Sequence, residues 1–512
     1  MENIFLKHFK IFKNFLHSIL NSNFFDEVSH NIAKNQLFIL SCVENGMVSN
    51  PDLIMDLIFP QKVLNNQVFI KDFYSTDIDK DANQCNAVNK ILGANNLVVI
   101  QGPPGAGKTT VIVEAIRQIK KRESNAKILL SSQTHVAVDN VMEKLLSTDL
   151  SLLRLKDKDK SKGMESIGLN SILENIVSKN SLISEYVDDL AMDYLNELIF
   201  NKDVIGITIN ALKGCKLNGF NSFDFGIVDE IGKATLPEIL FVAKYCKKLI
   251  IIGDPKQLPP TLNEYIDSQL ITKEEYDEIN MNPFVNYIFD NINPNCKVFL
   301  NKQYRMVREI GTFISDTYYN DGIDKLKNGR RDTNPQALNF IDYELNGHEV
   351  QLGCKKINNP YEVDIIEKLI LDRFSTMDKN DLVIISPYKD QVGLLRKRLP
   401  DYRIDTVDSF QGQSAKVVVY TCVRNVGNPT SFIKKENRTN VAISRAKDEI
   451  WIIGNAQYIK QISHLRKYLK FKTYDDELAI RSYIHYYDGN RIIYKYKGSP
   501  KNSVCSKKCN ND

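Results

Sequence analysis

The 512-residue sequence has no run of about 18 apolar residues, so no segment is typical of a transmembrane helix. Its nine cysteines are scattered except for Cys505 and Cys509, which argues against a disulfide framework and favours reduced thiols in a cytoplasmic protein. Lys7, Lys10 and Lys13 interrupt the apolar N-terminal stretch, whereas a signal peptide needs an uninterrupted one. We therefore expect a cytoplasmic protein without a membrane anchor.

A large excess of one charge is also missing. The formal net charge of +4 does not by itself indicate a nucleic-acid ligand, although a local basic surface can still bind one because binding follows the local field. The hydrophobic fraction of 43% is ordinary for a globular chain. The length exceeds what one core can hold, which predicts several domains.

The strongest signal is the string Gly102-x-x-x-x-Gly107-Lys108-Thr109, which follows the short apolar run 97–100 and precedes a segment with helical spacing. The glycines let backbone N–H groups cradle phosphates. Lys108 can reach the β- and γ-phosphates, and the Thr109 hydroxyl can bind Mg²⁺. The alternative is an ordinary glycine-rich turn, but the order strand, loop, helix favours a phosphate-binding loop.

An acidic pair follows a second apolar run. Asp229 and Glu230 come directly after residues 225–228, and Gln257 follows another apolar run at 248–252. Downstream of a phosphate loop, one carboxylate can hold Mg²⁺ and the other can activate water. The amide of Gln257 can contact the γ-phosphate or orient that water.

The part of the chain after residue 296 repeats the alternation of strands and helices but has no phosphate loop of its own. Its expected strands are 298–300, 382–385, 404–407, 417–420 and 450–453. Arg305 and Arg445 lie in non-periodic turns beside strands. Arginines from a facing domain can stabilise the transition-state charge of a nucleotide bound elsewhere. A surface ion pair is the alternative for each arginine taken alone, and it would contribute little.

Two polar residues near a strand end have two interpretations. Thr134 and His135 follow the apolar run 127–131 and precede a helical pattern. Ligands of open α/β sheets bind at the carboxyl ends of strands, which suits a contact role. Polar residues at such ends are also helix caps, so spacing alone leaves both interpretations open.

The flanking regions have simpler interpretations. Apolar residues between positions 5 and 19 recur at helical spacing, and docking on the next domain is favoured over a membrane-surface helix. Residues 145–203 interrupt the α/β alternation with a charged run at 156–160, which predicts a helical insertion. Residues 483–496 predict a β-hairpin with a primed turn, followed by a frayed tail. Cys505 and Cys509 lack the four ligands of a structural zinc site.

Taken together, these motifs resemble those of superfamily 1 helicases of the up-frameshift branch, P-loop ATPases that include RNA-decay helicases and DNA-replication helicase-nucleases. The matches occur in the family's order and cover about residues 80–455. They are Gln84 and the segments 102–110, 132–140, 206–208, 228–230, 253–260, 303–306, 386–388, 406–413 and 440–447.

The resemblance implies an α/β protein with two tandem RecA-like domains built on parallel sheets, ATP and Mg²⁺ between them, and single-stranded DNA or RNA across them. The expected division is a helical segment at 1–80, a first domain at 81–295 with the insertion, a second domain at 296–470, and a hairpin and tail at 471–512. We expect a monomer that does not bind membranes. The implied direction of movement is 5′-to-3′.

The resemblance also assigns roles to residues. Gln84 would read the adenine and Tyr304 would stack on it, while Asp229 would hold Mg²⁺ together with Thr109. The expected catalytic residues are Lys108, Asp229, Glu230, Gln257, Arg305 and Arg445. The expected nucleotide-binding residues are Gln84, Gly102, Pro103, Pro104, Gly105, Ala106, Gly107, Lys108, Thr109, Thr110, Tyr304 and Gly412. The expected nucleic-acid contacts are Thr134, His135, Thr208, Pro387 and Thr406.

The sequence departs from the family pattern at three places. Ile231 and Gly232 follow the acidic pair where the family usually has Ala next, and Ser414 stands where it usually has Glu. Residues 1–80 look too short and too helical for the family's β-barrel accessory domain, which makes translocation a safer prediction than strand separation. No nuclease constellation or iron–sulfur spacing is visible.

Two functions therefore remain in consideration. The first is an ATP-dependent helicase or translocase on single-stranded DNA or RNA, and the second is an ATP-switched nucleic-acid clamp that does not separate strands. A P-loop kinase or GTPase would have no use for the second α/β region, and no Asn-Lys-x-Asp base reader follows the acidic motif.

Overall fold

The computed structural model describes residues 3–21, 27–155, 167–168, 201–213, 223–260, 272, 274–275, 278–279, 283–320, 325–350, 356–410, 412–475 and 478–495. Most of the predicted insertion, its charged run, the predicted tail and the Cys505 and Cys509 pair lie outside these residues. Contacts divide the chain into two units. Unit 1 is Met1–Gly102, Gly107–Pro255 and Pro259–Leu300, and unit 2 is Pro103–Ala106, Lys256–Leu258 and Asn301–Asp512.

Unit 1 contains a seven-stranded sheet in which every pair of neighbouring strands is parallel. The strand order is β3 (Leu152–Arg154), β4 (Val204–Thr208), β2 (Ile128–Ser132), β5 (Phe223–Asp229), β6 (Cys246–Gly253), β1 (Leu97–Gln101) and β7 (Lys297–Phe299). The central strands are near-continuous apolar runs, as expected where helices cover both faces of a parallel sheet. The predicted α/β class with parallel sheets is therefore confirmed.

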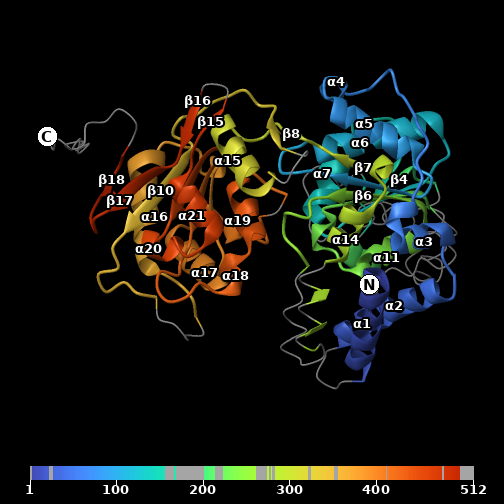
Figure 1. Cartoon of the computed structure of the whole chain (residues 1–512), viewed down its shortest axis with the longest axis horizontal. Helices are drawn as coiled ribbons and strands as arrows, with labels where there is room; N and C mark the ends of the chain where they lie inside the picture. The colour runs from blue at the N-terminus through green and yellow to red at the C-terminus, as the bar shows by residue number, and fades with distance from the viewer. Residues whose placement is uncertain are drawn as a thin grey trace, which may run out of the picture. The chain divides into compact units, whose positions relative to one another are not determined.

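Helices lie on both faces of this sheet (Figure 1). They are α5 (Ala82–Gly93), α6 (Lys108–Arg122), α7 (His135–Leu145), α10 (Ile209–Lys213), α11 (Leu236–Lys244) and α14 (Phe284–Asn291). Leu97 and Val99 of β1 belong to the same buried cluster as Leu240 of α11 and Phe289 of α14. Because alternate residues of a strand point to opposite faces, Val98 and Ile100 face the other helical layer.

The N-terminal helices pack on unit 1, the first two beside α11 and the fourth beside α5 (Figure 1). They are α1 (Ile4–Leu20), α2 (Glu27–Glu44), α3 (Pro51–Ile58) and α4 (Thr76–Asp79). Phe5, Phe12 and Leu16 of α1 are buried in the cluster that holds Leu97. The apolar face of α1 thus docks on the next layer, as the periodicity indicated. None of the helices in the described part of the chain is both long and apolar enough to cross a membrane.

Unit 2 contains a second seven-stranded sheet. Its order is β12 (Arg403–Thr406), β11 (Leu382–Ser386), β13 (Ala415–Thr421), β14 (Ala446–Ile453), β10 (Leu338–Tyr343), β17 (Tyr483–Tyr487) and β18 (Ile492–Ile493). The strands from β12 to β17 pair in parallel, and β17 and β18 form an antiparallel hairpin. At its turn Asp488 N–H donates to Arg491 O at 3.2 Å, and Gly489 has a φ of +97°.

The remaining elements of unit 2 are helices and two small sheets. The helices are α15 (Arg308–Tyr318), α16 (Pro360–Leu369), α17 (Lys389–Arg398), α18 (Ser431–Lys434), α19 (Glu436–Ile443), α20 (Ala456–Ile459) and α21 (Ser463–Lys470). The small sheets pair β8 (Lys302–Gln303) with β9 (Lys327–Asn328), and β15 (Lys472–Asp475) with β16 (Leu478–Arg481).

One expected strand belongs to a different sheet from the one predicted. The sequence predicts the run 298–300 as a strand of the second α/β region, but β7 pairs with β1 at the edge of the sheet of unit 1. The prediction was wrong because a short apolar run carries no information about which edge strand it will pair with.

Candidate functional site

The parallel register of unit 1 brings several sequence motifs to one edge of its sheet. Gln101 of β1 is paired with Gly253 of β6, and Ser132 of β2 is paired with both Asp229 of β5 and Thr208 of β4. These residues are the last of their strands, so the segments that follow them leave the sheet at the same edge. Ligands of open α/β sheets bind at such a carboxyl edge.

The phosphate loop leaves this edge and enters α6. Gly107 is the N-cap of the 15-residue helix and has a φ of +83°, in the left-handed region that favours glycine. Lys108 Nζ donates to Gly102 O at 2.7 Å, so the ammonium group lies against the loop. A helix N-terminus, loop N–H groups and an ammonium group together fit phosphate oxygens. Pro103, Pro104, Gly105 and Ala106 complete the loop, and Thr109 and Thr110 lie half-buried in the first turn of α6.

Gln84 lies next to this loop. It occupies the first turn of α5, where Asp81 caps the helix, and its side chain is buried. A Cβ placed on Gly107 would lie 2.6 Å from Gln84 Nε2. The structure thus brings the expected adenine reader and the expected phosphate loop together within unit 1.

Replacing Gly107 by alanine should lower the melting temperature of the chain. The left-handed conformation costs a non-glycine residue about 1–2 kcal/mol, and the new Cβ would also displace the Gln84 amide. Gly393→Ala in α17 is the matched control, because its Cβ would meet nothing within 4 Å and alanine favours a helix. Differential scanning calorimetry should show a fall only for the Gly107 variant. Equal shifts in both variants would contradict this account.

The acidic pair ends β5 at the same edge. Asp229 is buried, and burial raises the pKa of its carboxyl to about 6, against the lowering effect of the nearby Lys108 ammonium. The Glu230 carboxylate contributes to the rise. A divalent cation would favour the ionised form of such a carboxyl, which is the chemistry expected of an Mg²⁺ ligand.

Glu230 has an unusual backbone conformation. Its φ is +53°, and its N–H donates to Asp229 Oδ1 at 2.8 Å. Because of this left-handed conformation, Glu230 does not continue the strand. Its Oε2 lies 3.5 Å from Thr134 Oγ1. A non-glycine residue held in this region is frequently part of a functional site.

The three polar residues expected at the nucleic acid in unit 1 also have structural partners. Thr134 is the N-cap of α7 and accepts from Ala137 N–H at 3.3 Å. Thr208 accepts in the same way from Ala211 N–H at 3.2 Å. His135 Nδ1 lies 3.0 Å from Arg154 Nη2. The capping interpretation therefore holds for Thr134, and its expected contact with nucleic acid stays a prediction.

In unit 2, two of the expected nucleic-acid residues lie on neighbouring strands. Thr406 ends β12 and is paired with Ser386, the last residue of β11, which Pro387 follows. Both residues therefore lie at the carboxyl edge of this sheet. Thr406 Oγ1 is 3.1 Å from Ser409 Oγ, and Gly412 has a φ of +84°.

The two arginines lie together in unit 2, at the opposite edge. Arg445 directly precedes β14 and is buried, so it does not form a surface ion pair. Its guanidinium donates to Val441 O at 3.1 Å, to Gln413 O at 3.0 Å and to Gln257 Oε1 at 3.3 Å. Arg305 Nη1 donates to Ser444 O, the residue before Arg445, at 3.2 Å.

Sequence comparisons match most of the chain. Two family models match, and each is described as an AAA domain. One matches residues 79–189 and 170–264, and the other matches residues 283–457. DNA polymerase alpha-associated DNA helicase A of Saccharomyces cerevisiae is 27% identical over 480 residues, covering 78% of this chain and 68% of that protein. The regulator of nonsense transcripts 1 homolog of Neurospora crassa is 26% identical over 421 residues, covering 74% and 37%.

A third relative represents the helicase-nucleases. DNA replication ATP-dependent helicase/nuclease JHS1 of Arabidopsis thaliana is 25% identical over 445 residues, covering 82% of this chain and 30% of that protein. The chain belongs to the superfamily 1 helicases of the up-frameshift branch, which includes the helicase-nucleases. The chain spans about a third of the length of two of these relatives. Among solved structures, the crystal structure of arterivirus nonstructural protein 10 (helicase) is 15% identical with a TM-score of 0.41, covering 75% of this chain and 63% of that one.

In this superfamily 1 helicase, Gln303 fixes the turn that carries Tyr304 and Arg305. Its buried Oε1 accepts from the N–H groups of Arg305 at 3.0 Å and Met306 at 2.7 Å, and its Nε2 donates to Met306 O and to Asn328 Oδ1, both at 2.9 Å. Tyr304 is 44% exposed, and its N–H donates to Gly105 O at 2.9 Å. The motif string contained Gln303, but only the structure shows its positioning role.

Arg154 is a second residue of this helicase that the sequence reasoning missed. It is fully buried, and its Nε lies 2.7 Å from Asp139 Oδ1 while Nη2 contacts His135. The ion pair fixes the first part of α7, where His135 begins the helix. The available signal was an arginine within the otherwise apolar run at 152–155.

Proposed function

We propose that this chain hydrolyses ATP with Mg²⁺ and uses the reaction to move along single-stranded DNA or RNA. What carries the proposal is the gathering of phosphate loop, acidic pair and polar strand ends at one sheet edge of unit 1. The curated relatives are named as DNA helicases, helicase-nucleases and a regulator of nonsense transcripts. Their names agree on a nucleic-acid substrate and leave DNA and RNA both open.

The residues divide the chemistry among them. Bound Mg²⁺–ATP supplies the phosphoryl group and the metal charge that neutralises its oxygens. Lys108 and the loop N–H groups would bind the phosphates, and Asp229 and Thr109 would hold the metal. Glu230 accepts the proton of the attacking water. Gln257 orients that water.

Groups of unit 2 complete the proposed reaction. Arg305 and Arg445 would supply positive charge to stabilise the negative charge that develops on the phosphoryl group in the transition state. Tyr304 would stack on the adenine that Gln84 reads. Gly412 would lie near the nucleotide. Hydrolysis would then take place between two RecA-like domains at about 81–295 and 296–470. We propose a monomer as the working form.

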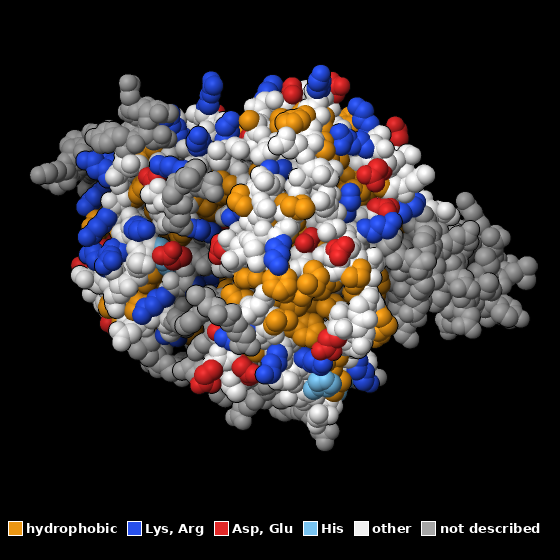
Figure 2. All heavy atoms as spheres, turned by 45° about the vertical axis from the view of Figure 1, so that its right-hand side comes forward, with side chains coloured by type: hydrophobic (Ala, Val, Ile, Leu, Met, Phe, Trp, Pro, Cys, Tyr) orange, Lys and Arg blue, Asp and Glu red, His pale blue; other side chains and the backbone are white. Residues whose placement is uncertain are grey.

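Nucleic acid would contact the carboxyl-edge residues by its backbone. On the face drawn in Figure 2, Lys and Arg side chains are interspersed with acidic ones and form no continuous basic track. Thr134, His135, Thr208, Pro387 and Thr406 would contact phosphates and sugars, which suits a motor that steps over any sequence. The Thr134 hydroxyl lies 3.5 Å from Glu230 Oε2, so a strand that contacts Thr134 would also change the surroundings of the general base.

An ATP-switched clamp is the second candidate. The observation that favours it is that the described residues between positions 3 and 80 are mainly helical and pack on unit 1. A clamp would bind single strands in response to ATP and would not separate a duplex. A strand-displacement assay distinguishes the two, because only a helicase releases the labelled strand.

Single-stranded nucleic acid should stimulate ATP hydrolysis by the purified chain about tenfold or more, a typical strength of coupling between two sites. Phosphate release is measured with no polymer, single-stranded DNA, single-stranded RNA and heparin, at one fixed salt concentration. Heparin controls for non-specific polyanion effects. Two results would contradict a nucleic-acid motor. Heparin could stimulate hydrolysis as strongly as nucleic acid does, or none of the polymers could stimulate it.

A further inference from the structure

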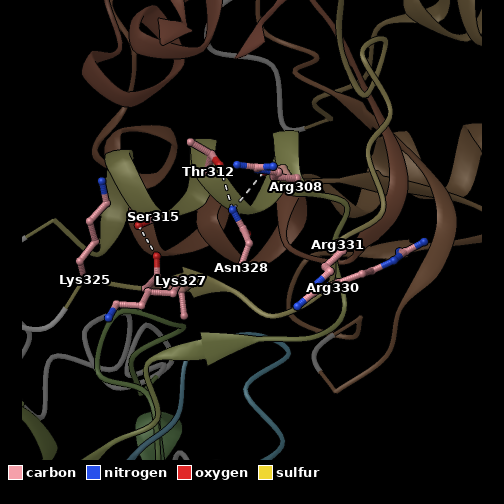
Figure 3. A pocket seen from close by; sticks show the side chains of 9 residues that line it. Arg308, Thr312, Ser315, Lys325, Lys327, Asn328, Arg330 and Arg331 are labelled. Carbon is pink, nitrogen blue, oxygen red and sulfur yellow. Dashed lines mark hydrogen bonds between the residues drawn. The ribbon is translucent and has the colours of Figure 1, made fainter. Parts of the chain in front are cut away.

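Unit 2 contains a pocket that the proposed function does not use. It has a volume of about 490 Å³ and lies between α15 and the segment 325–331 (Figure 3). Five of the described residues that line it are cationic, and we call it the basic pocket. They are Arg308, Lys325, Lys327, Arg330 and Arg331.

None of the described lining residues is acidic, but three carboxylates pair with two of the cations. Lys325 pairs with Asp316 at 3.1 Å, and Arg330 pairs with Asp332 and Asp448, both at 2.8 Å. The described residues provide no ion pair for Lys327 or Arg331, which are both exposed.

The rest of the lining is polar and held in place. Asn328 Nδ2 donates to Thr312 Oγ1 at 2.9 Å, and Ser315 Oγ donates to Leu326 O at 2.7 Å. Among the lining residues that the structure describes, Leu326 is the one apolar side chain and none carries an aromatic ring. These residues therefore offer a nucleobase no stacking surface, whereas they offer a compact anion charge and hydrogen-bond donors.

We propose that the basic pocket binds a small polyphosphate anion of the pyrophosphate class. Guanidinium and ammonium groups bind phosphate oxygens strongly through charge-assisted hydrogen bonds, and both kinds of group line this pocket. A nucleic-acid strand fits less well, because single-strand sites combine basic grooves with aromatic stacking.

The basic pocket shares residues with the turn that carries Arg305. Arg330 Nη1 donates to Arg305 O at 2.8 Å, and Asn328 accepts from Gln303 at 2.9 Å. A Cβ on Gly329 would lie 2.4 Å from the ring of Tyr304. An anion that reorients Arg330 or Asn328 would therefore change the position of this turn. This coupling rests on the proposed function, whereas binding of the anion does not.

The test is calorimetric titration of pyrophosphate into the full chain. All titrated chains carry Lys108→Ala, which weakens pyrophosphate binding at the phosphate loop. Adding Lys327→Ala with Arg331→Ala should weaken pyrophosphate binding roughly tenfold or more, because two charge-assisted contacts are lost. The matched control adds Lys397→Ala with Arg466→Ala, which removes the same charge from exposed helical positions of unit 2 and should leave the affinity unchanged.

Three outcomes would overturn the proposal. The pocket variant could bind pyrophosphate as tightly as the control, or no chain could bind it at all. Alternatively, in a fluorescence anisotropy titration, the pocket variant could lose affinity for a single-stranded oligonucleotide while its pyrophosphate affinity stays unchanged, which would make the pocket a nucleic-acid surface. Failure of the unaltered chain to hydrolyse ATP would count against the proposed function and leave the titration result standing.

Discussion

Replacing Lys108 by alanine should reduce ATP turnover by roughly a hundredfold to a thousandfold, the usual cost of losing one preorganised group that stabilises transition-state charge. Lys108 Nζ lies 2.7 Å from Gly102 O, inside the loop that would hold the phosphates. Alanine keeps the helix start, because it is the strongest helix former. The measurement is steady-state phosphate release at saturating ATP with single-stranded nucleic acid present.

The matched control is Lys121→Ala, near the other end of α6. Lys121 is exposed, and its Nζ lies 5.6 Å from the centre of the Tyr74 ring, so its removal changes charge without touching the loop. Circular dichroism checks that both variants are folded. If the Lys108 variant kept the turnover of the control, the loop would not be the hydrolytic site.

The fold class could be predicted from short apolar runs. The runs at 97–100, 225–228 and 248–252 are β1, β5 and β6 of one parallel sheet. Strands covered by helices on both faces are apolar throughout, so the signal is strong even without alternation. The spacing between the runs leaves room for crossover helices, which favours parallel pairing.

Pairing between distant strands could not be predicted in the same way. β10 was missed because Asn339 and Asp342 interrupt its apolar pattern, although its neighbours are β14 and β17. The Asn339 side chain is buried, lies 3.0 Å from His485 and donates to Gln336 O, which explains a polar residue at the centre of a sheet. Such partners come from segments far away in the sequence.

Some features of the candidate site could be predicted from the sequence and others could not. The identity and order of its motifs could be predicted, because each motif is local and the glycines and carboxylates have few other uses in those positions. The buried hydrogen bonds of Gln303 and the burial that raises the pKa of Asp229 could not, since both depend on segments that only the fold brings together. Thr134 shows the middle case, because its capping bond was foreseen as one of two alternatives.

Replacing Glu230 by glutamine should separate ATP binding from ATP hydrolysis. The amide has nearly the same shape and can keep the contact with Thr134, but it cannot accept the proton of the attacking water. Turnover should fall by roughly a hundredfold to ten-thousandfold, the usual contribution of a general base. Affinity for ATP should stay unchanged, because Lys108 and Asp229 keep their places.

The two quantities need separate measurements on the same protein. Calorimetric titration gives ATP affinity, and phosphate release gives turnover in the presence of single-stranded nucleic acid. Glu143→Gln is the matched control, since Glu143 is an exposed carboxylate on α7 of the same unit. Full turnover by the Glu230 variant would remove Glu230 from the role of general base. A loss of affinity equal to the loss of turnover would instead mean that this carboxylate acts mainly in binding the nucleotide and its metal.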